Sequence, residues 1–190
     1  MFIVKKKYFL IVESIKDIDL KNIKKRGKFS IIYRNKNKIE DFNGLLHFRR
    51  LCKLKSIKFY VANNEKLALK LHSDGIYLSA FNNSLKILSL KKFNFQMIGS
   101  AHNFKEISLK LKQGCNQILF SKLFRVNYNK KAPFLGVIKF NSFLKINKNL
   151  IPLGGINSKN LNSLKTLDCN GFAILSELKK KPANIVNRLF

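Results

Sequence analysis

Short apolar runs alternate with longer segments of helical period along the chain. The runs are rich in Ile, Val, Phe and Leu and lack polar alternation, which is typical of strands buried on both faces of a parallel sheet. Eight runs of this kind are present: Tyr8–Val12, Ser30–Tyr33, Lys58–Val61, Gly75–Leu78, Phe95–Gly99, Gln117–Phe120, Leu150–Leu153 and Gly171–Leu175. The pattern predicts eight parallel strands.

The segments between the runs carry helix signals. Glu40–Leu54 places its apolar residues at spacings of about three and four, as a buried helical face requires. Asn103 followed by Glu106 resembles a capping box, which predicts a helix that begins there and ends near Lys112. Two further helices are expected toward the carboxyl end, at Asn157–Leu167 and Ser176–Leu189.

This alternation predicts an α/β fold, and eight strands predict a closed (β/α)8 TIM barrel. The chain has 190 residues, which is short for such a barrel, so some of its helices must be trimmed. The trimming is expected early, because only about 17 residues separate the first two strands. No linker rich in Pro, Gly or Ser divides the sequence. We therefore expect one compact barrel domain over residues 1–190.

The composition excludes a disordered chain but leaves a large positive charge to explain. Hydrophobic residues make up 46% of the sequence, and Lys+Arg 38 against Asp+Glu 10 gives a net charge of +28. Only six of the basic residues are Arg, the type favoured for base readout and phosphate clamping. The lysines are spread along the chain, and the excess of Lys, Asn, Ile and Phe is typical of an AT-rich coding sequence. Nucleic-acid binding is therefore not expected to be the main function.

Other function classes are excluded by what the sequence lacks. No apolar stretch approaches 18 residues, and the N-terminus has no signal-peptide pattern, so neither a membrane span nor secretion is expected. Cys52, Cys115 and Cys169 are too few and too widely spaced for a disulfide framework or a zinc site. The sequence thus indicates a reduced, cytoplasmic protein.

The stretch IPLGGIN suggests a phosphate site. The seventh predicted strand runs directly into Gly154 and Gly155, where backbone amides can approach a ligand without a Cβ in the way. The eighth strand ends at Leu175 and Ser176, before another predicted helix. Amides after strands seven and eight form the usual phosphate site of this barrel.

Several motifs together resemble the thiamine-phosphate synthase family, which includes a TenI-like thiazole tautomerase branch. YFLIVE is similar to the family's first strand, IIYRNK to its second, and FYVANNEKLALKLHSDGIYLSA to its third strand, helix and fourth strand. MIGSAHNFKEI resembles its fifth-strand Ser-x-His stretch, and LFSKLFRVNYNKKAPFLG its sixth strand and long loop. IPLGGIN and NGFAILS supply the phosphate end. The resemblance covers nearly the whole chain, from about Tyr8 to Glu177.

The resemblance implies a transferase of thiamine biosynthesis. This reaction joins hydroxymethylpyrimidine diphosphate to thiazole phosphate and releases pyrophosphate, with Mg²⁺ on two aspartates and basic side chains neutralising the diphosphate. Carried over by motif, the catalytic candidates are Arg34, Lys36, Ser100 and, in the lysine-rich loop, Lys130. The phosphate-binding candidates are Gly154, Gly155, Leu175 and Ser176.

The chain departs from the family pattern at the metal. The two Mg²⁺-binding aspartates correspond to Asn63 and Asn82, so Mg²⁺ binding would have to rest on neutral amide oxygens. The hydroxyl positions of the sixth-strand loop fall on Val126 and Tyr128, and the tautomerase histidine falls on Lys122. Neither reaction of the family therefore has its full set of residues.

These departures leave alternatives open. The chain is either a synthase-like enzyme or a catalytically decayed or tautomerase-like relative that binds a thiazole or thiamine phosphate without synthase activity. Asn63 and Asn82 are also interpretable as turn and cap residues, and Lys122 and Lys130 as solvated lysines. His102 is expected to orient the start of a helix rather than to act in catalysis.

Overall fold

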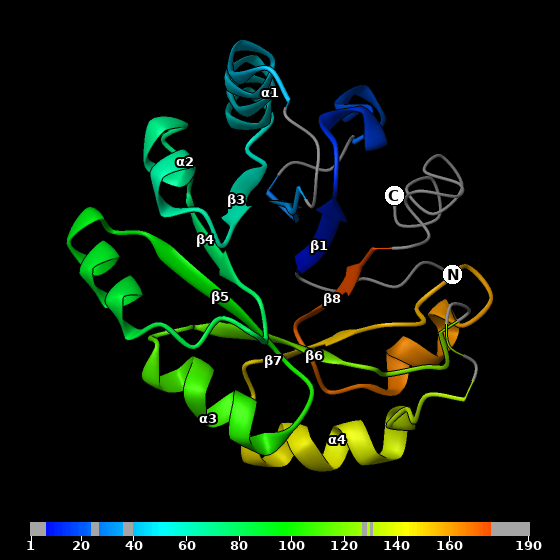
Figure 1. The fold of residues 1–190 in the computed structure, drawn as a ribbon. Coiled ribbons are helices and arrows are strands. Elements are labelled where there is room, and N and C mark those ends of the chain that lie inside the picture. Colours follow the sequence, from blue (N-terminus) through cyan, green and yellow to red (C-terminus); the bar gives the residue numbers. More distant parts are fainter. Residues whose placement is uncertain (1–6, 24–26, 36–39, 127–128, 130, 176–190) are drawn as a thin grey trace.

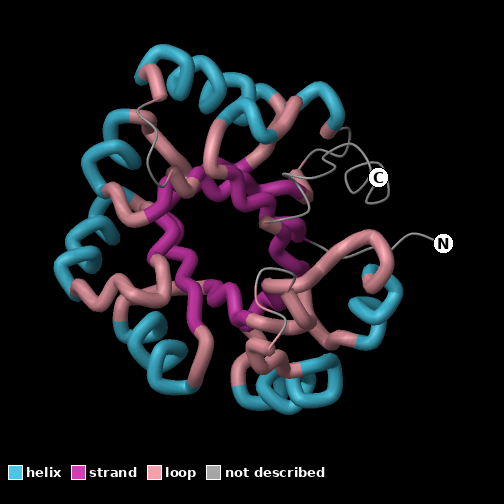
Figure 2. The backbone as a smooth tube through the Cα atoms, turned by 45° about the vertical axis from the view of Figure 1, so that its right-hand side comes forward, coloured by secondary structure: helices cyan, strands magenta, loops and turns pink. Residues whose placement is uncertain are grey.

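The computed structural model describes residues 7–23, 27–35, 40–126, 129 and 131–175. Eight parallel strands close into a barrel in the order of the sequence, with the helices arranged around it (Figures 1 and 2). The strands are β1 (Lys7–Val12), β2 (Phe29–Tyr33), β3 (Lys58–Ala62), β4 (Gly75–Leu78), β5 (Gln96–Ala101), β6 (Gln117–Ser121), β7 (Leu150–Leu153) and β8 (Gly171–Ile174). The predicted fold class is confirmed, and each predicted strand lies within one or two residues of an observed one.

Alternating residues of each strand face two different cores. Along β1, Phe9 and Ile11 point into the barrel interior, while Tyr8, Leu10 and Val12 face the surrounding helices. The interior is filled by one residue or two from each strand, all buried, among them Tyr60, Tyr77 and Leu119 from three different strands. Burial on both faces explains the continuous apolar runs.

The helices outside the barrel are unequal in length and type. The α-helices are α1 (Phe42–Leu54), α2 (Glu65–Lys70), α3 (Phe104–Lys112) and α4 (Gly136–Ile146). Shorter 3-10 helices are η1 (Ile15–Asp17), η2 (Leu20–Asn22), η3 (Leu85–Phe93) and η4 (Leu161–Thr166). Among the described residues, the connection from β1 to β2 holds only η1 and η2, and that from β4 to β5 only η3. The early trimming that the length predicts is therefore present.

Two helix predictions have different outcomes. The segment Asn157–Leu167 is not an α-helix; only Leu161–Thr166 is helical, and it is 3-10. Its buried residues Leu161, Leu164 and Leu167 recur every three positions, which matches three residues per turn. The helix expected over Ser176–Leu189 lies outside the described residues.

The strand pairings differ in extent around the barrel. β1 and β2 pair over five residues, from Tyr8↔Phe29 to Val12↔Tyr33. β7 and β8 pair at one position, Leu153↔Ala173. The barrel is therefore closed by its shortest ladder between its last two strands.

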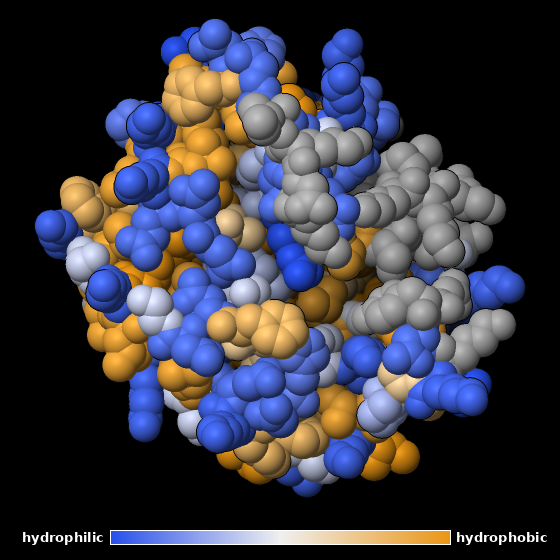
Figure 3. All heavy atoms as spheres, in the orientation of Figure 1, coloured by the Kyte–Doolittle hydropathy of each residue, from blue (hydrophilic) through white to orange (hydrophobic). Residues whose placement is uncertain are grey.

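Polar side chains are spread over the face of the molecule shown in Figure 3, with apolar patches between them. No helix among the described residues is long and apolar enough to cross a membrane.

Candidate functional site

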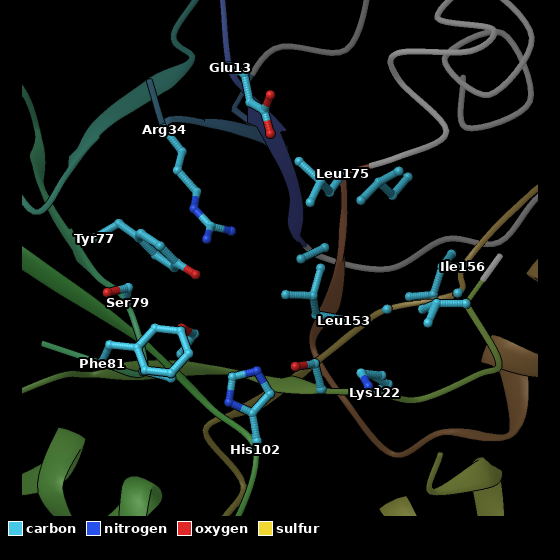
Figure 4. Close-up of a pocket in the computed structure, with 18 residues that line it drawn as sticks. Glu13, Arg34, Tyr77, Ser79, Phe81, His102, Lys122, Leu153, Ile156 and Leu175 are labelled. Carbon is cyan, nitrogen blue, oxygen red and sulfur yellow. The ribbon is translucent and has the colours of Figure 1, made fainter. Parts of the chain in front are cut away.

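A pocket of about 430 Å³ opens at the carboxyl ends of the strands, where barrels of this type bind their ligands. Figure 4 shows Glu13, Arg34 and Tyr77 pointing into it from one side. Lys122, Leu153, Ile156 and Leu175 line the opposite side (Figure 4). The pocket therefore combines charged and hydroxyl groups on one wall with a largely apolar wall opposite.

Arg34 and Glu13 reach the pocket because their strands are in register. Val12 pairs with Tyr33, and the next residues leave the sheet together, with the Arg34 amide donating to the carbonyl oxygen of Val12 at 2.8 Å. Both side chains line the pocket. The guanidinium offers several donors for a phosphate, and the carboxylate offers acceptors for an N–H or O–H of a ligand. The predicted role of Arg34 at the mouth is compatible with this placement.

Tyr77 and Ser100 form the buried part of the pocket. The side chain of Tyr77 comes from β4 and that of Ser100 from β5, and both residues are buried. Burial raises the pKa of the Tyr77 phenol, although the Ser100 hydroxyl and the Arg34 guanidinium act in the opposite direction. The phenol is therefore neutral at ordinary pH and is able to donate a hydrogen bond.

Gly154 and Gly155 make the turn that follows β7. Both have positive φ, +95° and +70°, a conformation that favours glycine. Among the hydrogen bonds of the described residues, none is donated by the amide of Gly155 or Ile156. Both residues line the pocket, and N–H groups without an internal acceptor are the kind that bind an anion. Leu175 lies across the same pocket, one residue beyond β8, while Ser176 lies outside the described residues.

Packing also requires glycine at position 155. A Cβ there would lie 2.5 Å from the carbonyl oxygens of Phe124 and Arg125. The Gly155 carbonyl oxygen in turn accepts hydrogen bonds from the side-chain amides of Asn157 and Asn160, at 3.1 and 2.8 Å. The turn is thus fixed from both sides, and a substitution at Gly155 cannot isolate a ligand-binding role.

Asn63 and Asn82 are brought together beside the pocket. The side-chain amide of Asn82 donates to Oδ1 of Asn63 at 3.3 Å, and the same oxygen accepts from the amide of Ser79 at 3.0 Å. Oδ1 of Asn82 accepts from the amide of Ser84 at 3.1 Å. Asn63 has a φ of +53°, and its neighbour Asn64 caps α2.

These residues do not fit the Mg²⁺ that the family resemblance implies. The Asn63 oxygen already accepts two hydrogen bonds, which is the number that its two lone pairs allow. Neither amide carries the negative charge that usually holds Mg²⁺. Within the described part of the chain, no group of three or more His, Cys, Asp or Glu side chains could hold a metal ion.

His102 lies at the edge of the pocket and is tied to the start of α3. Its amide donates to Oε2 of Glu106 at 2.7 Å, and its ring Nδ1 lies 3.0 Å from the same oxygen. These bonds support the expectation that His102 orients the helix. Lys36 and Lys130, two of the catalytic candidates, lie outside the described residues.

Several pocket residues escaped the sequence reasoning, among them Glu13, Tyr77 and Phe81. Glu13 directly follows the first strand, and the rule that a barrel strand ends at the ligand site could have identified it. Phe81 lines the pocket but is 85% exposed, and no periodicity or motif signal marks it.

The fold and the site together define a parallel (β/α)8 barrel with a glycine turn at the pocket of its carboxyl mouth. The family model described as thiamine monophosphate synthase matches residues 4–178, and the chain belongs to that family. The resemblance found in the sequence is therefore confirmed.

Individual relatives are distant. A thiamine-phosphate synthase of Prochlorococcus marinus subsp. pastoris is 28% identical over 77% of this chain, and one from another Prochlorococcus marinus strain is 32% identical over 70%. The chain spans about two fifths of the length of these relatives, as the matches cover 42% and 38% of them. A thiamine-phosphate synthase of Flavobacterium johnsoniae is 27% identical over 75% of this chain and 71% of its own length.

Solved structures show the same fold. Thiamine phosphate pyrophosphorylase from Pyrococcus furiosus superposes with a TM-score of 0.71 at 18% identity over 97% of both chains. A 2-keto-3-deoxy-6-phospho-gluconate aldolase from Zymomonas mobilis gives a TM-score of 0.62 at 12% identity, over 97% of this chain and 92% of its own.

Proposed function

We propose that this chain acts in thiamine biosynthesis as a thiamine-phosphate synthase-like transferase that joins hydroxymethylpyrimidine diphosphate to thiazole phosphate. One observation carries the proposal: a single pocket brings together the Arg34 guanidinium, the Ser100 hydroxyl and the open amides of Gly155 and Ile156. Donors of this kind suit two phosphorylated substrates better than one neutral substrate. Family membership supports the choice of substrates.

The proposed reaction is one substitution at the pyrimidine methylene carbon. The C–O bond to the diphosphate breaks, its electron pair leaves with pyrophosphate, and the lone pair of the thiazole nitrogen forms the new C–N bond. Negative charge grows on the leaving diphosphate, so fixed cations beside it stabilise the transition state. Among the described residues, Arg34 and Lys122 are the Arg and Lys side chains that line the pocket. Lys36 and Lys130 are proposed from the family motif alone.

Different parts of the pocket wall are proposed to bind the phosphate and the heterocycle of the substrates. The amides of Gly155 and Ile156 are proposed to hold the thiazole phosphate, together with the backbone at Leu175 and Ser176. The apolar side chains of Leu153 and Ile156 offer a surface for the heterocycle. Ser100 and Tyr77, which line the buried end, are proposed to donate hydrogen bonds to the substrates.

The test is a turnover assay on the full chain with both substrates, with thiamine phosphate detected by its thiochrome fluorescence. We expect turnover in the wild type and a loss of about tenfold or more in Arg34→Met, because a charge-assisted contact to the leaving group is removed. Arg50→Met is the matched control, since Arg50 is exposed on α1. Absence of turnover in the wild type contradicts the transferase proposal.

A second candidate is a relative that binds thiazole phosphate or thiamine phosphate without synthase activity, tautomerase-like or catalytically decayed. The hydrogen bond between Asn63 and Asn82 favours it, because amides bonded to each other are poor ligands for Mg²⁺. Calorimetric binding of thiamine phosphate to a chain without turnover would support this candidate. The double variant Asn63→Asp with Asn82→Asp would then be expected to gain Mg²⁺-dependent turnover.

A further inference from the structure

A fully buried lysine lies beneath the pocket edge. Lys110 belongs to α3, has an exposed fraction of 0%, and runs along β5 past Gly99. A Cβ at Gly99 would lie 2.8 Å from Cγ of Lys110, so glycine at this position leaves room for the lysine stem. The other lysines of α3, Lys105 and Lys112, are exposed. Lys110 therefore has a structural environment unlike its neighbours.

The buried ammonium of Lys110 donates a hydrogen bond to the segment that follows β4. Nζ of Lys110 donates to the carbonyl oxygen of Asn82 at 2.6 Å and to Oε1 of Gln113 at 2.9 Å. Nε2 of Gln113, which is also fully buried, donates to the carbonyl oxygens of Asn82 and Ser84, both at 2.9 Å. Lys110 of α3 and Gln113, the C-cap of that helix, thus hold two backbone carbonyl groups of the segment Ser79–Ser84, which we call the β4 loop.

The β4 loop is connected to the pocket and to the loop after β3. Ser79 and Phe81 line the pocket. The side chain of Asn82 reaches across to Asn63, whose oxygen also accepts from the Ser79 amide. The hydrogen bonds therefore run without a break from the buried ammonium to both loops that carry the family's metal positions.

Burying an ammonium costs desolvation free energy, so its hydrogen-bond partners must offset that cost. Burial lowers the pKa of Lys110, although the nearby Cys115 and Glu106 act in the opposite direction. An apolar side chain of similar volume would pack between α3 and β5 without that desolvation cost. The ammonium is matched here by carbonyl oxygens of the β4 loop, so what it stabilises is the position of that loop.

We propose that Lys110, with Gln113, is a positioning residue that fixes the β4 loop at the pocket edge from inside the protein, so that the loop needs no divalent cation. The ligand-binding consequence rests on the proposed function; the ordering of the loop does not.

The first test measures amide hydrogen exchange on the full chain. Lys110→Met keeps the stem beside Gly99 and removes the ammonium, which leaves the Asn82 carbonyl with one donor fewer. We expect at least about tenfold faster exchange at the Ser79 and Ser84 amides, with the strand amides unchanged, because a lost buried hydrogen bond lowers the local opening free energy. Lys112→Met is the matched control on the same helix.

Three results of this test would overturn the proposal. They are unchanged exchange at Ser79 and Ser84, equally faster exchange throughout the barrel, and slower exchange of these amides in the wild type when MgCl₂ replaces EDTA. If Lys110→Met does not fold, Gln113→Leu is judged by the same amides; it removes the two bonds from Gln113 to the β4 loop and the bond between Lys110 and Gln113.

The second test measures thiamine phosphate affinity by calorimetry. We expect a loss of about tenfold in Lys110→Met, none in Lys112→Met, and equal wild-type affinity in EDTA and in MgCl₂. Unchanged affinity in Lys110→Met, despite faster exchange, would contradict a positioning role at the pocket. If the wild type binds no thiamine phosphate, the proposed function fails, while hydrogen exchange still decides whether Lys110 holds the loop.

Discussion

At the scale of single residues, two glycines with nearly the same φ lie in different surroundings. Gly155 and Gly136 have φ values of +70° and +72°. A Cβ at Gly155 would lie 2.5 Å from the carbonyl oxygens of Phe124 and Arg125, whereas a Cβ at Gly136 would meet nothing within 4 Å. Substituting each glycine therefore distinguishes the free-energy cost of a positive φ from the free-energy cost of close packing.

We expect Gly136→Ala to lower the free energy of unfolding by about 1 kcal/mol, the cost of a left-handed conformation for an L-residue. Gly155→Ala should cost roughly 2 kcal/mol more, because its Cβ also has to displace backbone at 2.5 Å. Urea denaturation of both variants measures the difference. Equal losses would show that the turn relaxes freely and that Gly155 is not held by packing.

At the scale of elements, α3 organises the edge of the site at both of its ends. Its cap, Asn103, accepts from the Glu106 amide at 2.9 Å, and the Glu106 carboxylate accepts from the Asn103 side chain and from His102. Burial by itself would raise the pKa of Glu106, but the hydrogen bonds from His102 and Asn103 outweigh it and lower the pKa.

This lowered pKa predicts a dependence of stability on pH. Because the folded state favours the carboxylate, Glu106 stabilises the fold above the ordinary carboxyl range, and the contribution is lost as pH falls through the lowered pKa. Glu106→Gln should therefore cost about 1 kcal/mol at pH 7 and progressively less below about pH 4.

Thermal unfolding of wild type and Glu106→Gln across this pH range tests the prediction. Glu65→Gln, in the first turn of α2, controls for a charge at a helix N-terminus without these donors. A difference that stays constant from pH 7 to pH 3 would exclude the carboxylate as its source.

The elements were largely predictable because local signals specify them. The apolar runs identified all eight strands, and the capping box at Asn103 identified the start of α3. The glycine turn after β7 was predictable from the strand that enters it. Glu13 was predictable from its place directly after the first strand. Phe81 and the hydrogen bonds of Lys110 and Gln113 to the β4 loop were not, since each depends on contacts between residues distant in sequence. From the sequence alone, a lysine in a helix is expected to be exposed to solvent. The burial of Lys110 becomes visible only in the folded structure.

At the scale of the whole molecule, the net charge of +28 is the dominant electrostatic feature. In the described part of the chain, ion pairs are few, and those of Lys148 with Asp168 and of His102 with Glu106 are partly or well exposed. Arg49 with Asp74 is more buried, at 3.2 Å. The remaining positive charges repel one another and oppose the compact state.

Salt should therefore stabilise the fold by screening. We expect the Tm to rise by about 3 °C between 50 and 500 mM NaCl, which corresponds to about 1 kcal/mol for a chain of this size. Sucrose of equal osmolality serves as a control for solvent exclusion. A Tm that falls with NaCl would indicate that attractive pairs, rather than repulsion, dominate the surface.

The single pairing between β7 and β8 is the weakest join in the barrel wall. Leu153 and Ala173, which form that pairing, also line the pocket, with Gly154 and Leu175 just beyond them. Since opening this join breaks fewer hydrogen bonds than opening the five-residue ladder of β1 with β2, we expect the mouth to open here first. We therefore expect the rim to widen between β7 and β8, while the neighbouring ladders of β1 with β2 and of β2 with β3, which pair over five and four residues, stay closed.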